Sequence, residues 1–276
     1  MNAASSVTWL FVPGDRPDRF DRAVAAKADE IIIDLEDAVA PAAKLQARQE
    51  TAQWLSSGGE AWVRLNGRQT SWFDHDAANL AGAPGLRGFI LPKCEDPDEV
   101  MALADVARRR LDVIALIESA GGVVGAQAIA ACPATVRLAF GAVDFALDID
   151  ASESRNALLA ARSFLVLASR AAGKPAPIDS VTTALSPAVA AADALHAREL
   201  GFGGKLCIHP RQVGPVSAAF RPTEDEVSAA RAVLRAARAS DGVTTIGGRM
   251  IDRPVIERAQ RIVEKASSGN PAESNR

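Results

Sequence analysis

Two short apolar runs each end in one carboxylate close to a glycine. The first occupies residues 114–118 and ends in Glu118, and the second occupies residues 137–144 and ends in Asp144. Acidic side chains are seldom buried unless they pair with a cation or bind a metal. The carboxylates are 26 residues apart, about one strand–helix–strand unit. This spacing predicts two oxygen ligands for Mg²⁺ at one sheet edge; two unrelated helix caps or surface acids are the alternative.

Two earlier apolar runs also contain or lead to charged residues. The run at 31–35 leads to Glu36 and Asp37, and the run at 62–65 contains Arg64. Arginine presents a planar fork of donors that grips carboxylate or enolate oxygens. We therefore expect Arg64 to be a catalytic residue, with a purely structural ion pair to Glu36 or Asp37 as the alternative. Glu36 and Asp37 are themselves candidate catalytic carboxylates, because acid–base chemistry needs a group that moves a proton.

Further positive charge is expected around the same place. Arg16 and Arg19 flank a turn that opens a helix, a position suited to phosphate, although a solvated helix start would have the same sequence. Lys93 follows the fourth apolar run and would either add positive charge there or pair with the acids. These three residues are the candidate binding groups for an anionic cofactor or substrate.

The bulk composition narrows the class of protein. The chain has 276 residues, a net charge of −3 and three widely spaced cysteines. The charge argues against a broad nucleic-acid surface, and the cysteine spacing suggests neither a zinc site nor a disulfide framework. No apolar run is long enough for a membrane span, and residues 1–6 do not resemble a secretory signal. We expect a cytoplasmic enzyme that acts on small-molecule substrates.

The elements that must position these residues alternate regularly. Helix-like segments such as 41–55, 154–172 and 187–200 separate eight strand-like runs, which are 9–12, 31–35, 62–65, 88–91, 113–117, 138–141, 178–181 and 205–208. Eight β/α units predict an α/β fold, a (β/α)₈ TIM barrel over residues 8–220. The polar candidates gather at the carboxyl ends of the runs, whereas small or apolar residues such as Ala61 and Gly204 are typical of the amino ends.

Residues 221–276 are expected to form a helical extension. Thr223 and Glu226 resemble a capping pair at the start of a long helix, and a last helix follows Arg253-Pro254. Gly247-Gly248 lies in the connector and would be a hinge, so the extension could act as a lid. Asp252 precedes the last helix and is either its N-cap or a catalytic residue that the lid delivers.

Several ordered motifs resemble those of a known family. The chain is similar to citrate lyase beta-subunit-like proteins, the CoA ester lyases of the HpcH/HpaI aldolase superfamily, from about Leu10 to Lys265. The matching stretches are 10–17, 34–39 with Lys44 and Arg48, 63–66, 91–93, 116–119, 140–144, 208–210 and 248–254.

The resemblance implies a Mg²⁺-dependent lyase that cleaves or forms 3-hydroxyacyl-CoA thioesters such as malyl-, citramalyl- or citryl-CoA, giving acetyl-CoA and an oxo-acid. It implies a homotrimer or hexamer. By motif, Glu118 and Asp144 match the metal ligands, Arg64 the active-site arginine, and Asp252 an acid/base from a neighbouring subunit's lid. Arg16 and Arg19 lie in the loop that is near the CoA in relatives.

The sequence also departs from the family pattern. Relatives often continue toward Leu-Gly after the second metal ligand, whereas here Asp148 and Asp150 follow and would compete as ligands or alter the pocket. Two other functions stay open. One is a CoA-independent aldolase of 2-oxo acids, and the other is a beta subunit of a multi-subunit citrate lyase that uses a carrier-bound thioester.

Overall fold

The computed structural model describes residues 3–107, 111–239, 244–246 and 249–268. Contacts divide the chain into two compact units, Met1–Ser217 and Ala218–Arg276.

The first unit is a closed barrel of eight parallel strands, each beside the next in sequence and the last beside the first. The strands are β1 (Thr8–Pro13), β2 (Glu30–Asp34), β3 (Ala61–Arg64), β4 (Leu86–Leu91), β5 (Val113–Ile117), β6 (Thr135–Phe140), β7 (Ile178–Asp179) and β8 (Gly204–Cys207). Every predicted strand is present, which confirms the predicted TIM barrel. The register pairs Asp34 with Arg64.

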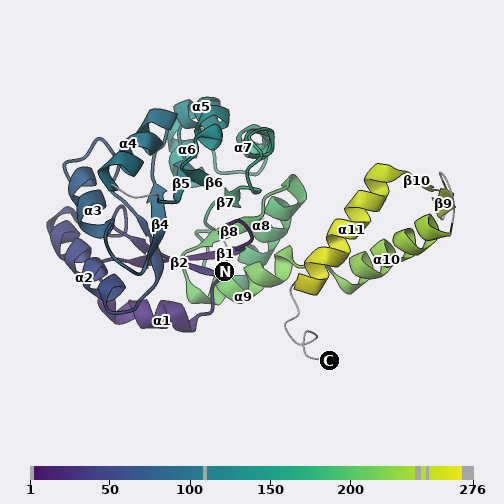
Figure 1. Ribbon diagram of the computed structural model, residues 1–276, viewed down its shortest axis with the longest axis horizontal. Coiled ribbons are helices and arrows are strands. Elements are labelled where there is room, and N and C mark those ends of the chain that lie inside the picture. Colours follow the sequence, from purple (N-terminus) through teal and green to yellow (C-terminus); the bar gives the residue numbers. More distant parts are fainter. Residues whose placement is uncertain (1–2, 108–110, 240–243, 247–248, 269–276) are drawn as a thin grey trace. The chain divides into compact units, whose positions relative to one another are not determined.

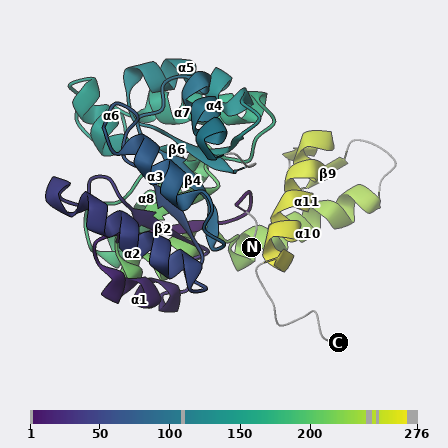
Figure 2. The same ribbon diagram turned by 60° about the vertical axis from the view of Figure 1, so that its left-hand side comes forward.

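Helices follow the strands and surround the barrel (Figures 1 and 2). They are η1 (Pro17–Arg19), α1 (Phe20–Ala25), η2 (Pro41–Ala43), α2 (Lys44–Ser56), α3 (Phe73–Leu80), α4 (Pro97–Ala107), α5 (Ala120–Ala131), α6 (Ala142–Asp148), α7 (Leu159–Ala171), α8 (Pro187–Leu200) and α9 (Pro210–Phe220). Strands covered on both faces are mainly apolar, as β5 is throughout and β2 is between its two terminal acids, Glu30 and Asp34. The helix predicted over 154–172 begins at Leu159 instead.

Large side chains fill the barrel interior. Trp9 and Trp62 meet edge to face with ring centres 5.6 Å apart, and the cluster continues with Ile32, Ile90, Ile114, Leu116, Ala139, Ile178 and Leu206. The interior is therefore a packed core, so polar chemistry is confined to the barrel ends.

The amino ends of the strands are more polar than expected. Glu30 and Arg137 are both buried there. Arg137 donates hydrogen bonds to the carbonyls of Ala3, Ser6 and Ala176 at 2.6–2.9 Å. Small or apolar residues begin β3, β4, β5, β7 and β8, as expected, but the buried charges of Glu30 and Arg137 were not expected, because a single charged residue inside a strand gives no sign of which barrel end it closes.

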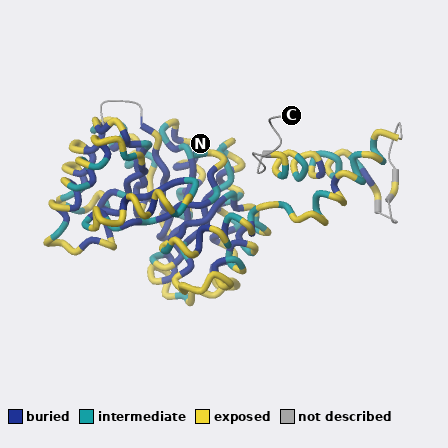
Figure 3. The backbone as a smooth tube through the Cα atoms, turned by 90° about the horizontal axis from the view of Figure 1, so that it is seen from below, coloured by how far each residue is buried: buried dark blue, intermediate teal, exposed yellow. Residues whose placement is uncertain are grey.

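The second unit contains α10 (Glu224–Arg238), β9 (Thr244–Ile246), β10 (Arg249–Ile251) and α11 (Arg253–Ser268). Thr223 and Glu226 form the expected capping box at the start of α10. The segment between the two helices was expected to be an irregular connector, but its residues 244–246 and 249–251 form the antiparallel strands β9 and β10. The expected hinge at Gly247-Gly248 lies outside the described residues. Most residues of α10 and α11 are of intermediate burial or exposed (Figure 3). Nowhere in the described chain is a helix long and apolar enough to cross a membrane.

Candidate active site

A buried ion pair joins the carboxyl ends of β2 and β3. The Nε and Nη2 atoms of Arg64 donate to the two carboxylate oxygens of Asp34 at 2.7 and 2.6 Å. Burial would raise the pKa of Asp34, but the Arg64 charge outweighs it and holds that pKa below its ordinary value. Burial likewise opposes the Arg64 charge, yet the carboxylates around it raise its pKa. Both side chains are thus fully charged and rigidly held.

The same guanidinium also meets the two acids expected from the sequence. Its Nη1 atom lies 3.1 Å from Glu36 Oε2 and 3.4 Å from Asp37 Oδ2. The structural ion pair considered above therefore exists, but its main partner is Asp34, which sequence reasoning missed. Asp34 ends β2 and lies opposite the last residue of β3 in the parallel register, and it is this register that pairs it with Arg64.

Glu36 is the least satisfied member of this group. Its Oε2 atom is buried without a hydrogen-bond partner, since the short contact to Arg64 is poorly aligned. On the other side Lys93 Nζ lies 3.4 Å from Oε1. Burial is the main reason that the pKa of Glu36 rises to about 7, with repulsion from Asp37 and Asp34 adding to it. A carboxylate with this pKa can exchange a proton near neutral pH.

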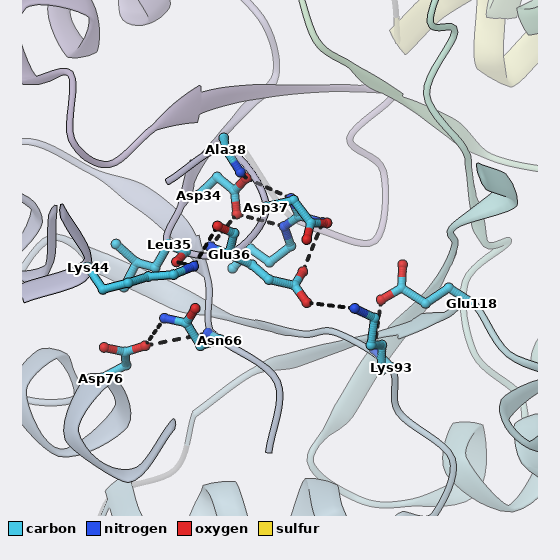
Figure 4. A network of polar contacts seen from close by, with 11 residues as sticks. Asp34, Leu35, Glu36, Asp37, Ala38, Lys44, Asn66, Asp76, Lys93 and Glu118 are labelled. Atoms are coloured by element: carbon cyan, nitrogen blue, oxygen red, sulfur yellow. Dashed lines mark hydrogen bonds and ion pairs between the residues drawn. The ribbon is translucent and has the colours of Figure 1, made fainter. Parts of the chain in front are cut away.

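Lys44 fixes the backbone that carries Glu36. Its buried Nζ atom, at the start of α2, donates to the carbonyls of Leu35 and Glu36 at 2.8 and 2.7 Å (Figure 4). A second buried pair lies alongside, where Arg48 donates to Asp76 at 2.6 Å. Asp76 in turn accepts from the side-chain amide of Asn66, whose Nδ2 atom lies 2.6 Å from Asp76 Oδ2. The motif residues Lys44 and Arg48 thus support the site without entering it.

Glu118 follows directly after β5 and is only 3% exposed. Its Oε1 atom accepts a hydrogen bond from the Lys93 backbone amide at 2.8 Å. Lys93 has a left-handed φ of +51°, an unfavourable conformation for a residue with a side chain. On the other side a Cβ at Gly141 would lie 2.3 Å from Glu118 Oε2, so only glycine fits there.

The charge of Glu118 is poorly compensated. Burial chiefly raises its pKa to about 8, and the negative charges of Glu36 and Asp144 raise it further against the opposing effect of Arg64. An acid in this state is costly to ionise unless a cation arrives.

Asp144 lies in the first turn of α6 and not at the end of a strand, which corrects the expectation from sequence. The chain leaves β6 at Phe140 and turns into the helix at Gly141. Asp148, at the other end of α6, accepts a hydrogen bond from the Ala120 amide at 2.7 Å and is exposed. Asp150 is exposed and has a φ of +53°.

These residues fit a hard divalent cation. No cluster of three or more acidic, histidine or cysteine side chains within the described residues is arranged to enclose a metal. Glu118 and Asp144 offer oxygen atoms, and Mg²⁺ commonly takes one or two carboxylates and fills its other positions with water and substrate. Burial and the neighbouring carboxylates make the ionised form of Glu118 unfavourable, and a bound divalent cation would stabilise that form.

The two candidate arginines after β1 are exposed. Arg16 forms an ion pair with Asp18 at 3.0 Å across η1, and Arg19 ends this short helix. Asp252, in the second unit, has a defined local role, because its Oδ1 atom accepts from the Val255 amide at 3.2 Å in the first turn of α11. The helix-cap interpretation of Asp252 is therefore correct, and its catalytic interpretation stays a prediction.

Comparison with known proteins gives a consistent picture. The sequence pattern described as HpcH/HpaI aldolase/citrate lyase matches residues 8–210. A citrate lyase subunit beta-like protein of Mycobacterium tuberculosis is 37% identical over 271 residues, covering 95% of this chain and 96% of that protein. Citrate lyase subunit beta of Leuconostoc mesenteroides is 35% identical over 291 residues, covering 97% and 95%.

A solved structure agrees in three dimensions. The crystal structure of the M. tuberculosis protein CitE in complex with magnesium, acetoacetate and coenzyme A superposes with a TM-score of 0.86 at 35% sequence identity. The match covers 96% of this chain and 99% of that one.

Proposed function

The chain belongs to the HpcH/HpaI aldolase/citrate lyase family, and from this we propose that it is a Mg²⁺-dependent carbon–carbon lyase of 3-hydroxyacyl-CoA thioesters. Its products in the cleavage direction are acetyl-CoA and an oxo-acid, with malyl-, citramalyl- and citryl-CoA as the substrate class. The observation that carries the proposal is the buried, under-compensated Glu118 beside Arg64 at the carboxyl end of the barrel. Magnesium, acetoacetate and coenzyme A in the structure of the relative support it.

Glu118 and Asp144 are the residues we assign to the metal. A bound Mg²⁺ would supply Lewis acidity to the oxygen of the oxo-acid carbonyl. The protein's part is to present both carboxylates ionised and to exclude bulk water, which the burial of Glu118 supports.

Arg64 has donors to spare for a substrate. Asp34 accepts from two of its five N–H groups, and the Nη1 atom lies near Glu36 and Asp37. We assign to Arg64 the stabilisation of the enolate oxygen that forms as the bond breaks. Asp34 prevents the guanidinium from turning away, so the donors are in position before the charge develops.

Glu36 is the carboxylate that we assign to the substrate hydroxyl, with Asp37 as its exposed neighbour. It takes the hydroxyl proton, the O–H electrons form the new carbonyl, and the electrons of the broken C–C bond form the acetyl-CoA enolate. Asp252 of a neighbouring copy then protonates the enolate carbon. In the condensing direction each step runs backwards.

The remaining assignments concern CoA and assembly. Arg16, Arg19 and Lys93 are the cations proposed to meet the CoA phosphates, and residues 221–276 are the proposed lid. Because Asp252 would act on a neighbouring copy, we propose a homotrimer or hexamer. Sedimentation equilibrium at several concentrations tests this assembly directly.

The decisive experiment is to incubate the purified chain with acetyl-CoA and glyoxylate, pyruvate or oxaloacetate, with and without Mg²⁺, while following product mass. Metal-dependent formation of a 3-hydroxyacyl-CoA supports the proposal and identifies the oxo-acid. Turnover of free 2-oxo acids without any CoA dependence would make the chain a CoA-independent aldolase instead.

The names of the relatives favour one alternative. Since the Leuconostoc relative is a citrate lyase beta subunit, this chain could act on a thioester carried by another protein. Activity only after addition of a thioester on an acyl-carrier protein would establish that function in place of the stand-alone lyase.

A further inference from the structure

The helix that carries Asp144 lacks a capping side chain of its own. A helix start leaves its first backbone amides without partners, and the residue at the N-cap usually accepts from one of them. In α6 that position is Gly141, which has no side chain. No other residue fits, because a Cβ at Gly141 would lie 2.3 Å from Glu118 Oε2. The position of Glu118 thus requires a glycine at the N-cap of α6, the helix that carries Asp144, and this glycine cannot cap the helix.

The missing acceptor comes from the neighbouring strand. Ser180 follows β7, and its Oγ atom accepts a hydrogen bond from the Ala142 amide, the first residue of α6, at 2.9 Å. Ser180 is only 1% exposed. Asp144 lies two residues further along the same helical turn. We propose that Ser180 is a positioning residue that fixes the first turn of α6, and so Asp144, beside Glu118.

Ser180 is held by a buried network with no other evident task. Lys205 Nζ donates to the Ser180 carbonyl at 2.6 Å and to Asp179 Oδ2 at 3.1 Å. Arg162 Nε completes the group by donating to Asp179 Oδ1 at 2.9 Å. The strand neighbours Ile178 and Leu206 belong to the barrel interior, so Asp179 and Lys205 point to the opposite face of the wall. Their charges therefore anchor the segment from outside the reaction space.

The network also holds the other side of the turn. The Arg162 guanidinium lies over the ring of Phe140 at 5.1 Å, and Phe140 is the last residue before Gly141. Phe140 in turn packs against Phe145 of α6, with ring centres 5.5 Å apart. The β6–α6 turn is thus fixed by a hydrogen bond at its helical end and by stacking at its strand end.

This role rests on the proposed function, because it matters only if Asp144 holds the metal. Ser180→Ala leaves the Ala142 amide without an acceptor and frees the turn that orients Asp144. We expect about a tenfold weaker binding of divalent cation, the usual size of an outer-shell effect. Ser180→Cys retains a weak acceptor of similar size and should lie between the wild type and Ser180→Ala.

Thr182→Val is the matched control. Thr182 lies two residues away, is 4% exposed, and its hydroxyl donates to Asp193 at 2.9 Å. The substitution removes one buried hydrogen bond of the same segment but leaves α6 untouched.

The test is titration of the metal-free proteins with Mn²⁺, followed by electron paramagnetic resonance, together with thermal unfolding. The role is supported if Ser180→Ala loses about tenfold in Mn²⁺ affinity while Thr182→Val keeps the wild-type affinity at a similar melting temperature. Unchanged affinity in Ser180→Ala, or equal losses in both variants, overturns the role of Ser180 alone. If the wild-type chain binds no Mn²⁺, the proposed function is overturned and this role falls with it.

Discussion

Two arginines, one mostly buried and one fully buried, lie at opposite ends of one barrel and have opposite kinds of partner. Arg64, at the carboxyl end, is gripped by Asp34 and flanked by Glu36 and Asp37. Arg137, at the amino end, donates to three backbone carbonyls, and its guanidinium lies 5.9 Å from the Trp9 ring. Burial lowers the pKa of Arg137 to about 9, so it remains charged at neutral pH. The pKa of Arg64 is raised, because its carboxylates outweigh the effect of burial.

The difference shows that Arg137 has a structural role at the amino end of the barrel, whereas Arg64 belongs to the candidate active site at the carboxyl end. Backbone carbonyls are neutral and already fixed by the fold, so they satisfy the Arg137 donors without cancelling its charge, and Glu30 is the acid whose charge favours the charged form of Arg137. At the other end the carboxylates that surround Arg64 and Lys93 outnumber these cations; they are Asp34, Glu36, Asp37, Glu118 and Asp144. Ionising Glu118 and Glu36 among these carboxylates is unfavourable until a cation arrives, so this end is suited to binding one.

The largest expected effect comes from Glu118→Gln. The substitution removes a proposed metal ligand, and we expect metal-dependent activity to fall at least about a thousandfold, or about 4 kcal/mol. The metal-free protein should become more stable. The raised pKa of about 8 means that the folded state holds a proton which the unfolded state releases above its own pKa, so stability falls as pH rises toward 8. Removing this penalty should stabilise the metal-free protein by about 4 kcal/mol at pH 8.

Glu30→Gln is the control at the amino end. Glu30 is equally buried, but Ser6 and Trp62 donate to it at 2.8 and 3.1 Å, and Arg87 lies within 3.4 Å. We expect a loss of stability of about 1 to 2 kcal/mol with unchanged activity. Chemical denaturation of both metal-free variants at pH 8 measures the contrast. Destabilisation of Glu118→Gln by the same amount would remove the distinction between the two ends.

Arg64→Met and Arg137→Met test the two arginines themselves. The first leaves Asp34 buried and unpaired, and should destabilise the fold by about 3 to 5 kcal/mol and lower kcat at least about a hundredfold. The second removes one donor from each of three carbonyls, of which that of Ser6 still accepts from Trp9 Nε1, and should lower stability by about 2 to 4 kcal/mol with kcat preserved. Urea unfolding and steady-state kinetics at a temperature where both are folded check the pair. A hundredfold loss of kcat in Arg137→Met would show that both ends serve the reaction.

The barrel and much of this site could be predicted because they leave local signals. Apolar runs of strand length end in polar residues, and parallel strands bring their carboxyl ends together, so Arg64, Glu36, Lys93 and Glu118 could be expected near one another. The resemblance then assigned roles that no spacing could supply, such as that of Asp252.

The misses have physical reasons. Arg137 and Glu30 look like ordinary polar positions in a strand, because a chain sequence does not reveal which carbonyls converge on a buried guanidinium. Asp34 was overlooked as the partner of Arg64 because nearby acids compete for the assignment in sequence, and only the strand register selects one. The helical position of Asp144 depends on the turn at Gly141, where the close approach of Glu118 leaves room only for glycine.

A pH series sharpens the contrast further. Metal must displace the proton that Glu118 holds below its pKa of about 8. We therefore expect Mg²⁺ affinity to rise about tenfold per pH unit between about pH 6 and 8 and to level off above. Glu36→Gln removes a neighbouring charge that raises the Glu118 pKa, so its curve should level off at a lower pH. Calorimetric titration gives the affinities, and a flat profile from pH 6 to 8 would contradict the assignment of Glu118.

The smallest effect is expected from two lysines, one at each end of the barrel, that each donate hydrogen bonds to two backbone carbonyls. Lys44 Nζ holds the carbonyls of Leu35 and Glu36, and Lys174 Nζ holds those of Cys132 and Thr135 at 3.3 and 2.5 Å. Either change to Met should lower stability by about 1 to 2 kcal/mol, because two carbonyls lose a donor. Only Lys44→Met should lower kcat/KM, by about tenfold, since only its carbonyls orient a proposed catalytic side chain. Equal kinetics in both variants at matched stability would mean that Glu36 needs no such support.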